Sequence, residues 1–350
     1  MMLCALIYIF LIYFTNLAFC NIQCKDENNQ NVDWFIMYKL PKQTQHENEL
    51  IKVGLAYAFI TPQNIGNGWT TSAVSINSSQ SMLGYTLKPL YENDINLEFI
   101  YNDQPPSGTA GDEYGHSKGI LLADRNTGIW LIHSVPHFPQ VQDSLYSYPK
   151  TATHFGQSVL CVTLNLNTFE TVANQLLYIH PYSYKKNLPE FVEPNKYPSL
   201  KSLFRGDQIM KAPFWSKNEI QSLSKVNFQS YAKSSKFNKD LYVDWLAQDL
   251  RDDLEVETWP NGPGRLRSNC SLQYRVNNIS SVKINSTNLV FSDHVDHSKW
   301  AITAQKTWIC IGGVNRAEHQ EHRGGGTLCL NSSKIWLSYK MSVQEIEDCP

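Results

Sequence analysis

The chain has 350 residues, of which 42% are hydrophobic and 18% are charged, so it can form two folded lobes and is not a disordered protein. Its formal charge is −2 with all 10 histidines neutral, whereas a protein that binds nucleic acid at neutral pH usually has a basic surface. At neutral pH this composition argues against strong attraction to a polyanion. At about pH 5, protonation of the histidines would make the surface cationic and allow such attraction.

The first predicted element is the almost entirely apolar stretch Leu3–Phe19, which is followed by Cys20. It predicts a secretory signal peptide over residues 1–20, although the usual basic start is missing. An uncleaved membrane anchor is the alternative, because the apolar run barely reaches spanning length. No later segment is long and apolar enough to cross a bilayer, so we expect no membrane contact after cleavage.

Removal of this leader leaves six cysteines, an even number that predicts three disulfides in a secreted chain, with fifteen connectivities open. A zinc site is the alternative, but Cys-x-x-Cys and Cys/His knuckle spacings do not occur. The six are Cys24, Cys161, Cys270, Cys310, Cys329 and Cys349. Five Asn-x-Ser/Thr sequons predict exposed loops that carry N-glycans, and they begin at Asn77, Asn269, Asn278, Asn285 and Asn331.

The sequence pattern of the first half indicates several strands followed by a helix. Residues 33–40 read as a strand that ends at Pro41. Residues 118–122 and 128–133 predict the two strands of a hairpin, because a polar turn separates two apolar runs. Residues 168–178 predict an amphipathic helix.

A change in composition divides the chain near its middle. Residues 185–200 are rich in Pro, Lys and Asn, which is typical of a connection between folded units. We therefore expect an N-terminal lobe over residues 21–195 and a C-terminal lobe over residues 196–350.

The second half mixes one helix with short strands and glycine-rich turns. Residues 239–252 predict a helix, and residues 282–284 and 308–311 predict strands. Residues 312–315 form a turn, Gly-Gly-Val-Asn. Residues 323–327 predict a flexible loop that could offer backbone N–H groups to a phosphate, although a plain linker between strands is the alternative.

A His-x-Lys pair occurs once in each half, as His116 with Lys118 and as His297 with Lys299. Alternate side chains of a strand share a face, so each imidazole and ammonium point the same way. The ammonium can hold a phosphate oxygen, while the imidazole can attack phosphorus or protonate a leaving oxygen. A single His-x-Lys pair usually lies at a solvent-exposed strand edge and has no catalytic role. Two copies half a chain apart predict one shared site for a phosphodiester.

The second copy is followed by the turn 312–315, whose N–H groups could stabilise a phosphoryl transition state. This order of motifs resembles the phospholipase D superfamily, in which two half-domains meet across a pseudo-twofold axis. The superfamily aspartate five positions after the lysine is replaced here by Ala123 and by Ala304. That departure argues against phospholipid hydrolysis and indicates a divergent branch.

The chain more closely resembles the deoxyribonuclease II family, in order and spacing from about residue 24 to Cys349. The motifs that carry the resemblance are residues 32–41, 115–119, 133–139, 239–242, 296–300 and 323–329. It implies an α/β (α+β) fold of two similar lobes, each a mixed β-sheet flanked by helices, arranged as a phospholipase D-like pseudo-dimer with one active site. It also implies the disulfides Cys24–Cys161, Cys270–Cys349 and Cys310–Cys329.

The family's activity, carried over by matching position, is that of a secreted or lysosomal acid endonuclease. It would cut double-stranded DNA with little sequence preference and without a metal ion or cofactor, leaving 3′-phosphate and 5′-hydroxyl ends. The resemblance implies that His116, Lys118, His297 and Lys299 form the catalytic centre. One histidine would form a phosphohistidine and the other would act as acid and base; the sequence does not decide which.

Further residues are candidates for binding the substrate. Asn315 and Ser134 are candidate phosphate ligands, and His133 is either a third ligand or a hydrogen-bonded structural histidine. His294 is expected at the surface. Four tryptophans could stack on bases, although aromatic residues at strand positions more often belong to the core; these are Trp34, Trp130, Trp245 and Trp300.

Two other functions stay open at this stage. The chain could be a secreted DNA-binding or effector protein of the same family that has lost catalysis, although such a protein would be expected to have lost one His-x-Lys pair. It could also be another phosphodiesterase, acting on RNA or lipid, because a covalent histidine mechanism does not depend on the 2′-hydroxyl of the substrate.

Overall fold

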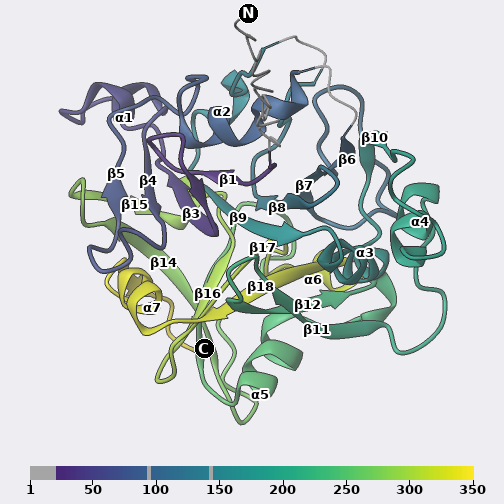
Figure 1. Ribbon diagram of the computed structural model, residues 1–350. Coiled ribbons are helices and arrows are strands. Elements are labelled where there is room, and N and C mark those ends of the chain that lie inside the picture. Colours follow the sequence, from purple (N-terminus) through teal and green to yellow (C-terminus); the bar gives the residue numbers. More distant parts are fainter. Residues whose placement is uncertain (1–20, 93–95, 142–144) are drawn as a thin grey trace, which may run out of the picture.

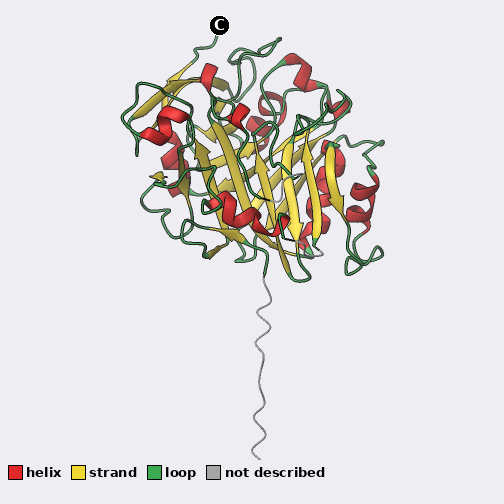
Figure 2. Ribbon diagram, turned by 90° about the horizontal axis from the view of Figure 1, so that it is seen from above, coloured by secondary structure: helices red, strands yellow, loops and turns green. Residues whose placement is uncertain are grey.

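A computed structural model describes residues 21–92, 96–141 and 145–350 (Figure 1). The predicted signal peptide, residues 1–20, lies outside the described residues. Two main β-sheets form the centre of the molecule, and most helices lie around them (Figure 2). A short hairpin, β1 (Cys24–Lys25) and β2 (Asn31–Val32), precedes the first sheet. The mixed α/β character expected from the sequence is therefore confirmed.

The first sheet has the strand order β10-β6-β7-β8-β9-β3-β4-β5, and all its neighbouring strands are antiparallel. Its strands are β3 (Trp34–Lys39), β4 (Tyr57–Ile60), β5 (Thr70–Thr71), β6 (Leu97–Asn102), β7 (Lys118–Ala123), β8 (Thr127–His133), β9 (Gln157–Asn165) and β10 (Ser183–Asn187). The predicted first strand and the predicted hairpin are thus present as β3, β7 and β8.

The second sheet has the order β11-β12-β18-β17-β16-β13-β14-β15, with β19 paired to β14 and only β13 and β14 parallel. Its strands are β11 (Trp215–Gln221), β12 (Asn227–Lys233), β13 (Leu254–Glu257), β14 (Val276–Ile284), β15 (Leu289–Ser292), β16 (Trp300–Thr303), β17 (Trp308–Gly312), β18 (Gly325–Asn331) and β19 (Val343–Ile346). The predicted strands at 282–284 and 308–311 lie within β14 and β17.

Both faces of the central strands are buried, which explains why their sequences do not alternate between apolar and polar residues. In β3, Ile36 and Tyr38 belong to the hydrophobic cluster that lies between the two sheets. Phe35 and Met37, on the other face, belong to a second cluster with helix α2. A third cluster covers the outer face of the second sheet.

Seven α-helices lie in the part of the chain that the structure describes. They are α1 (Glu49–Val53), α2 (Met82–Leu87), α3 (Thr168–Ile179), α4 (Pro198–Arg205), α5 (Ala247–Leu250), α6 (Glu318–Glu321) and α7 (Ser333–Lys340). Helix α3, predicted from its periodicity, packs on β9 of the first sheet and on β11 and β12 of the second (Figure 1). The helix predicted over 239–252 is a π-helical turn, η4 (Tyr242–Leu246), that runs into α5. No helix of the described ranges has both the length and the apolar character needed to cross a membrane.

The prediction of a flexible loop at residues 323–327 is wrong for residues 325–327, because strand β18 begins at Gly325. The reason is close packing rather than flexibility. A Cβ on Gly325 would lie 2.3 Å from a methyl carbon of Val314, and a Cβ on Gly326 would lie 2.4 Å from the carbonyl oxygen of Tyr231. These glycines let neighbouring chain segments approach the strand.

Three disulfides join Cys24 to Cys161, Cys270 to Cys349 and Cys310 to Cys329, so the pairing implied by the resemblance is confirmed. The first ties the N-terminal hairpin to β9. The third links opposed residues of β17 and β18.

Candidate active site

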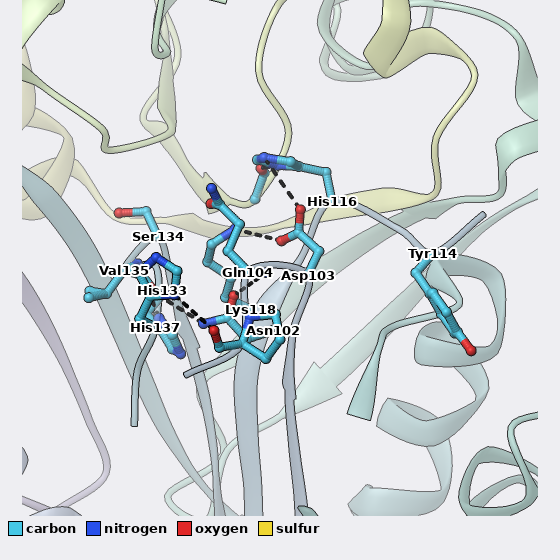
Figure 3. Close-up of polar contacts among 12 residues, drawn as sticks. Asn102, Asp103, Gln104, Tyr114, His116, Lys118, His133, Ser134, Val135 and His137 are labelled. Carbon is cyan, nitrogen blue, oxygen red and sulfur yellow. Dashed lines mark hydrogen bonds and ion pairs between the residues drawn. The ribbon is translucent and has the colours of Figure 1, made fainter. Parts of the chain in front are cut away.

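The first His-x-Lys pair lies where the chain enters strand β7, and it surrounds a buried carboxylate. Lys118 donates to Oδ1 of Asp103 at 2.5 Å, and Nε2 of His116 lies 3.8 Å from Oδ2 of the same carboxylate (Figure 3). Arg323 approaches that Oδ2 at 3.3 Å from the second half of the chain. The Asp103 carboxylate therefore lies within ion-pair distance of three basic side chains. Asp103 was not predicted as a site residue from the sequence.

The charges in this cluster shift the titration of its members. Burial alone would raise the pKa of Asp103, but Lys118, His116 and Arg323 together hold it well below its usual range. Burial lowers the pKa of His116 to about 3, in spite of the opposing attraction of Asp103, and the neighbouring Lys118 lowers it further. The imidazole is therefore neutral in the site without substrate.

The second pair lies just before strand β16 and has a different environment. The ammonium of Lys299 donates to the carbonyl oxygen of His297, and no carboxylate of the described residues lies within ion-pair distance of it. Burial, together with the charge of Lys118, lowers the pKa of Lys299 to about 7. Burial and the two lysine charges also hold the pKa of His297 well below its ordinary value.

Two buried carboxyls near Lys299 form no ion pair with a basic side chain of the described residues. Asp296 accepts hydrogen bonds from the hydroxyls of Tyr38 and Ser298, and burial raises its pKa. Both oxygens of Glu257 lack a hydrogen-bond partner among the described residues, and burial raises its pKa well above the ordinary value. The second His-x-Lys pair is therefore surrounded by carboxyl groups whose own protonated, neutral form is favoured by burial.

Each histidine ring is held by a carbonyl group from the other half of the chain. Nδ1 of His116 lies 2.5 Å from the carbonyl oxygen of Gly313, and Nδ1 of His297 lies 3.1 Å from that of Ser134. A carbonyl oxygen only accepts, so we assign the proton of each neutral ring to Nδ1. In both rings Nε2 is then the nitrogen left with a free electron pair. The lysine of each His-x-Lys motif acts electrostatically on the histidine of the other motif, so the two motifs lie near each other.

The remaining predicted site residues have mixed surroundings. The Ser134 hydroxyl has no proton left for a phosphate, because it donates to Gln157 at 2.6 Å; it also accepts from the Ser158 N–H at 2.9 Å. Its contribution to the site is the carbonyl group described above. Asn315 is 8% exposed, and its buried side-chain oxygen lacks a hydrogen-bond partner among the described atoms.

His133 has the surroundings of a structural histidine. It is 1% exposed, its Nδ1 accepts the Val135 N–H at 3.2 Å, and its ring stands edge-on to Phe138. Burial lowers its pKa to about 3. Its Nε2 lacks a partner among the described residues.

The tryptophans suggested as base-stacking residues are mostly part of the core. Trp34, Trp130 and Trp300 are buried, which supports the alternative that the sequence left open. Trp245 packs against the ring of Tyr231 in β12 and against that of Phe237, in the turn after this strand. Two aromatic side chains lie beside His297 instead: the ring centroids of Trp259 and Phe155 are 5.1 Å and 6.3 Å from that of the imidazole.

Six of the other predicted residues concern the surface. His294 is exposed, as expected. Asn77, Asn285 and Asn331 are exposed and Asn269 is half-buried. Asn278 is buried, and its amide nitrogen donates to the Leu266 carbonyl and to Glu347, so a glycan on that nitrogen would break both hydrogen bonds.

Among residues 21–92, 96–141 and 145–350, no group of three or more His, Cys, Asp or Glu side chains is placed to hold a metal ion.

Comparison with known proteins gives relatives over nearly the whole chain. The family model for deoxyribonuclease II matches residues 23–349. Deoxyribonuclease-2-alpha of Mus musculus is 38% identical over 335 residues, which cover 94% of each chain. Deoxyribonuclease-2-beta of Homo sapiens is 36% identical over 352 residues, 97% of this chain and 95% of that protein. Plancitoxin-1 of Acanthaster planci is 36% identical over 335 residues, 94% of this chain and 92% of that protein.

Proposed function

Because the chain belongs to the deoxyribonuclease II family and is a deoxyribonuclease II-like hydrolase, we propose that it is an acid endonuclease that hydrolyses DNA without a metal ion. It cuts double-stranded DNA with little sequence preference and leaves 3′-phosphate and 5′-hydroxyl ends. The observation that carries this proposal is the pair of histidines held through Nδ1 beside two buried lysines.

The proposed reaction has two steps on one phosphorus atom. Nε2 of one histidine attacks phosphorus, the bond to the 5′ oxygen breaks, and the second histidine gives that oxygen a proton. The second histidine then takes a proton from water, which attacks phosphorus and breaks the phosphorus–nitrogen bond. The first histidine is restored, and the 3′-phosphate leaves.

The basic side chains would hold the phosphate during both steps. Lys118 and Lys299 are placed beside the histidines and can neutralise the oxygens of the phosphoryl group. The side-chain nitrogen of Asn315 would donate a further hydrogen bond to the phosphate, because the amide oxygen can only accept. Lys118 donates one hydrogen bond to Asp103, so its ammonium has further protons to donate to the phosphate.

Acid conditions follow from the titration of the histidines. Burial keeps both imidazoles neutral in the site without substrate, whereas the acid step needs one of them protonated. A bound phosphate anion raises the pKa of the nearby imidazole, and low pH supplies the proton. This requirement fits a protein that works in a lysosome or an acidic extracellular space after secretion, and the three disulfides fit an oxidising compartment.

We also propose that the two halves, residues 21–195 and 196–350, form a phospholipase D-like pseudo-dimer with one shared site. Two sheets of similar strand order, one from each half, support this arrangement. The shared site makes both histidines necessary. His116→Ala and His297→Ala should each remove nearly all cleavage of plasmid DNA at about pH 5 in excess EDTA, and the double variant should lose little more.

Two independent half-sites would instead leave each single variant with about half of the activity. Full activity of a folded His297→Ala protein would refute the shared site. A wild-type protein that binds DNA in this assay without cutting it would favour the binding or effector alternative, and cleavage of RNA alone would favour the other phosphodiesterase.

A further inference from the structure

Two lysines far from each other in the sequence are buried without a carboxylate partner. Lys39 ends strand β3, Lys233 ends strand β12, and both have an exposed fraction of 0%. Neither forms an ion pair with any described residue. A buried ammonium without an ion pair is costly, so its hydrogen bonds need an explanation.

Each ammonium group donates only to backbone carbonyls of one short segment. For Lys39 it is a loop at residues 153–156, and for Lys233 it is the end of helix α6 with the loop that follows it. Lys39 donates to the carbonyls of Thr153 and Phe155, the latter at 2.7 Å. Lys233 donates at 2.8, 3.0 and 2.7 Å to the carbonyls of Gln320, Glu321 and Arg323, which uses all three of its protons.

Each of these loops ends in a glycine that holds a histidine of the proposed site. The Gly156 carbonyl accepts the His297 N–H at 2.9 Å, and the Gly324 carbonyl accepts the His116 N–H at 2.8 Å. The residues that follow these glycines, Gln157 and Gly325, are the register partners of Lys39 and Lys233. The same arrangement therefore occurs twice.

The two arrangements cross between the sheets. Lys39 belongs to the first sheet, but the loop that it holds fixes His297 of the second half. Lys233 belongs to the second sheet, and its loop fixes His116 of the first half. The ring contacts of the two histidines cross in the same way, so each histidine is held at its backbone N–H and at Nδ1 by the opposite half.

We propose that Lys39 and Lys233 are positioning residues. Each lysine holds a loop by hydrogen bonds to its carbonyls, and the glycine carbonyl at the end of that loop fixes the catalytic histidine of the opposite half. This inference rests on the proposed nuclease function. The arrangement requires glycine at both positions, because a side chain would collide with neighbouring atoms. A Cβ on Gly156 would lie 2.4 Å from Asp296 Oδ1, and a Cβ on Gly324 would lie 2.1 Å from the Ile179 carbonyl oxygen.

The charge state of the lysines suits an acid enzyme. Burial lowers the pKa of Lys233 to about 8, against the attraction of Asp240 and Glu321. Burial also lowers the pKa of Lys39 well below its ordinary value, against the attraction of Asp296. At acid pH the Lys233 ammonium is charged and donates to all three carbonyls of its loop.

The test replaces each ammonium by an apolar group of similar length, as Lys39→Met and Lys233→Met. Lys186→Met is the matched control, because Lys186 also donates to a backbone carbonyl, that of Phe204. Amide hydrogen exchange is measured at His116 and His297, and kcat and KM are measured on DNA. Lys39→Met should speed exchange roughly tenfold or more at His297 and leave His116 unchanged, and Lys233→Met should do the reverse.

Each methionine variant should also lower kcat by roughly tenfold to a hundredfold with little change in KM, because misplacing a catalytic group affects the chemical step. The control should change neither quantity. Should a methionine variant not fold, Lys39→Gln and Lys233→Gln, which keep a shorter uncharged donor, are read by the same measurements.

Equal exchange changes at both histidines, or at neither, would overturn the proposal, as would a variant with wild-type kcat. A fall in melting temperature alone would show a structural role only and would also overturn it. If the wild-type protein does not cleave DNA, the proposed function fails, while the crossed exchange pattern still supports or overturns the positioning of the two histidines.

Discussion

Replacing Lys299 should abolish cleavage and at the same time stabilise the fold at acid pH. Lys299 is 1% exposed, and its pKa is lowered from 10.5 to about 7. One pKa unit corresponds to about 1.4 kcal/mol, so charging Lys299 costs the folded state about 5 kcal/mol relative to the unfolded chain. Lys299→Met removes this cost but loses the hydrogen bond to the His297 carbonyl, worth about 1.5–3 kcal/mol, so the net gain in folding stability is about 2–3.5 kcal/mol.

The dependence on pH identifies the cause. The folded pKa of Lys299 lies below its unfolded pKa, so its full penalty is present below about pH 7 and decreases as the pH rises toward 10.5. In thermal unfolding at about pH 5 the variant should melt roughly 5 °C above the wild type. Its advantage should shrink by about 2–3 kcal/mol between pH 7 and pH 9. The exposed Lys186→Met variant is the control, and a Lys299→Met protein that is less stable than wild type at pH 5 would refute the reasoning.

Three further outcomes follow from the site and the surface. Plasmid cleavage should persist in excess EDTA and be fastest on the acid side, and a rate maximum above about pH 8 would contradict the histidine mechanism. Asp103→Asn should shift the NMR titration of the His116 ring to lower pH, because the neighbouring anion that favours the imidazolium is lost; an unchanged titration would show that Asp103 does not act on His116. Peptide mapping of protein from secreting cells should find a glycan on exposed Asn285 and none on buried Asn278, and the opposite result would contradict the described hydrogen bonds of Asn278.

Much of the fold follows from local sequence patterns. The hairpin predicted at 118–122 and 128–133 is present as β7 and β8, and the helix predicted at 168–178 is α3. These elements are visible in sequence because apolar runs and polar turns lie close together along the chain. The two His-x-Lys pairs were also recognisable, since each combines two reactive side chains at strand spacing.

The support around the site was not recognisable, because it acts through backbone groups and distant residues. Asp103 is one acidic residue among many until the pairing of β6 and β7 brings it beside Lys118. Lys39 and Lys233 bind carbonyl oxygens, which every residue has, so no side-chain pattern marks their partners. The glycines at 325 and 326 were interpreted as flexibility, whereas neighbouring atoms leave no room there for a Cβ.

The two halves hold their histidines in the same way but surround them with different charges. His116 faces the ionised carboxylate of Asp103, whereas His297 lies among lysines and buried carboxyls that favour the neutral form. An ionised carboxylate stabilises an imidazolium, and a site without one favours a neutral imidazole. Matching backbone contacts therefore hold the two rings in the same way, whereas the neighbouring charges differ. The attraction of Asp103 opposes burial at His116, and burial and the charges of Lys299 and Lys118 all lower the pKa of His297.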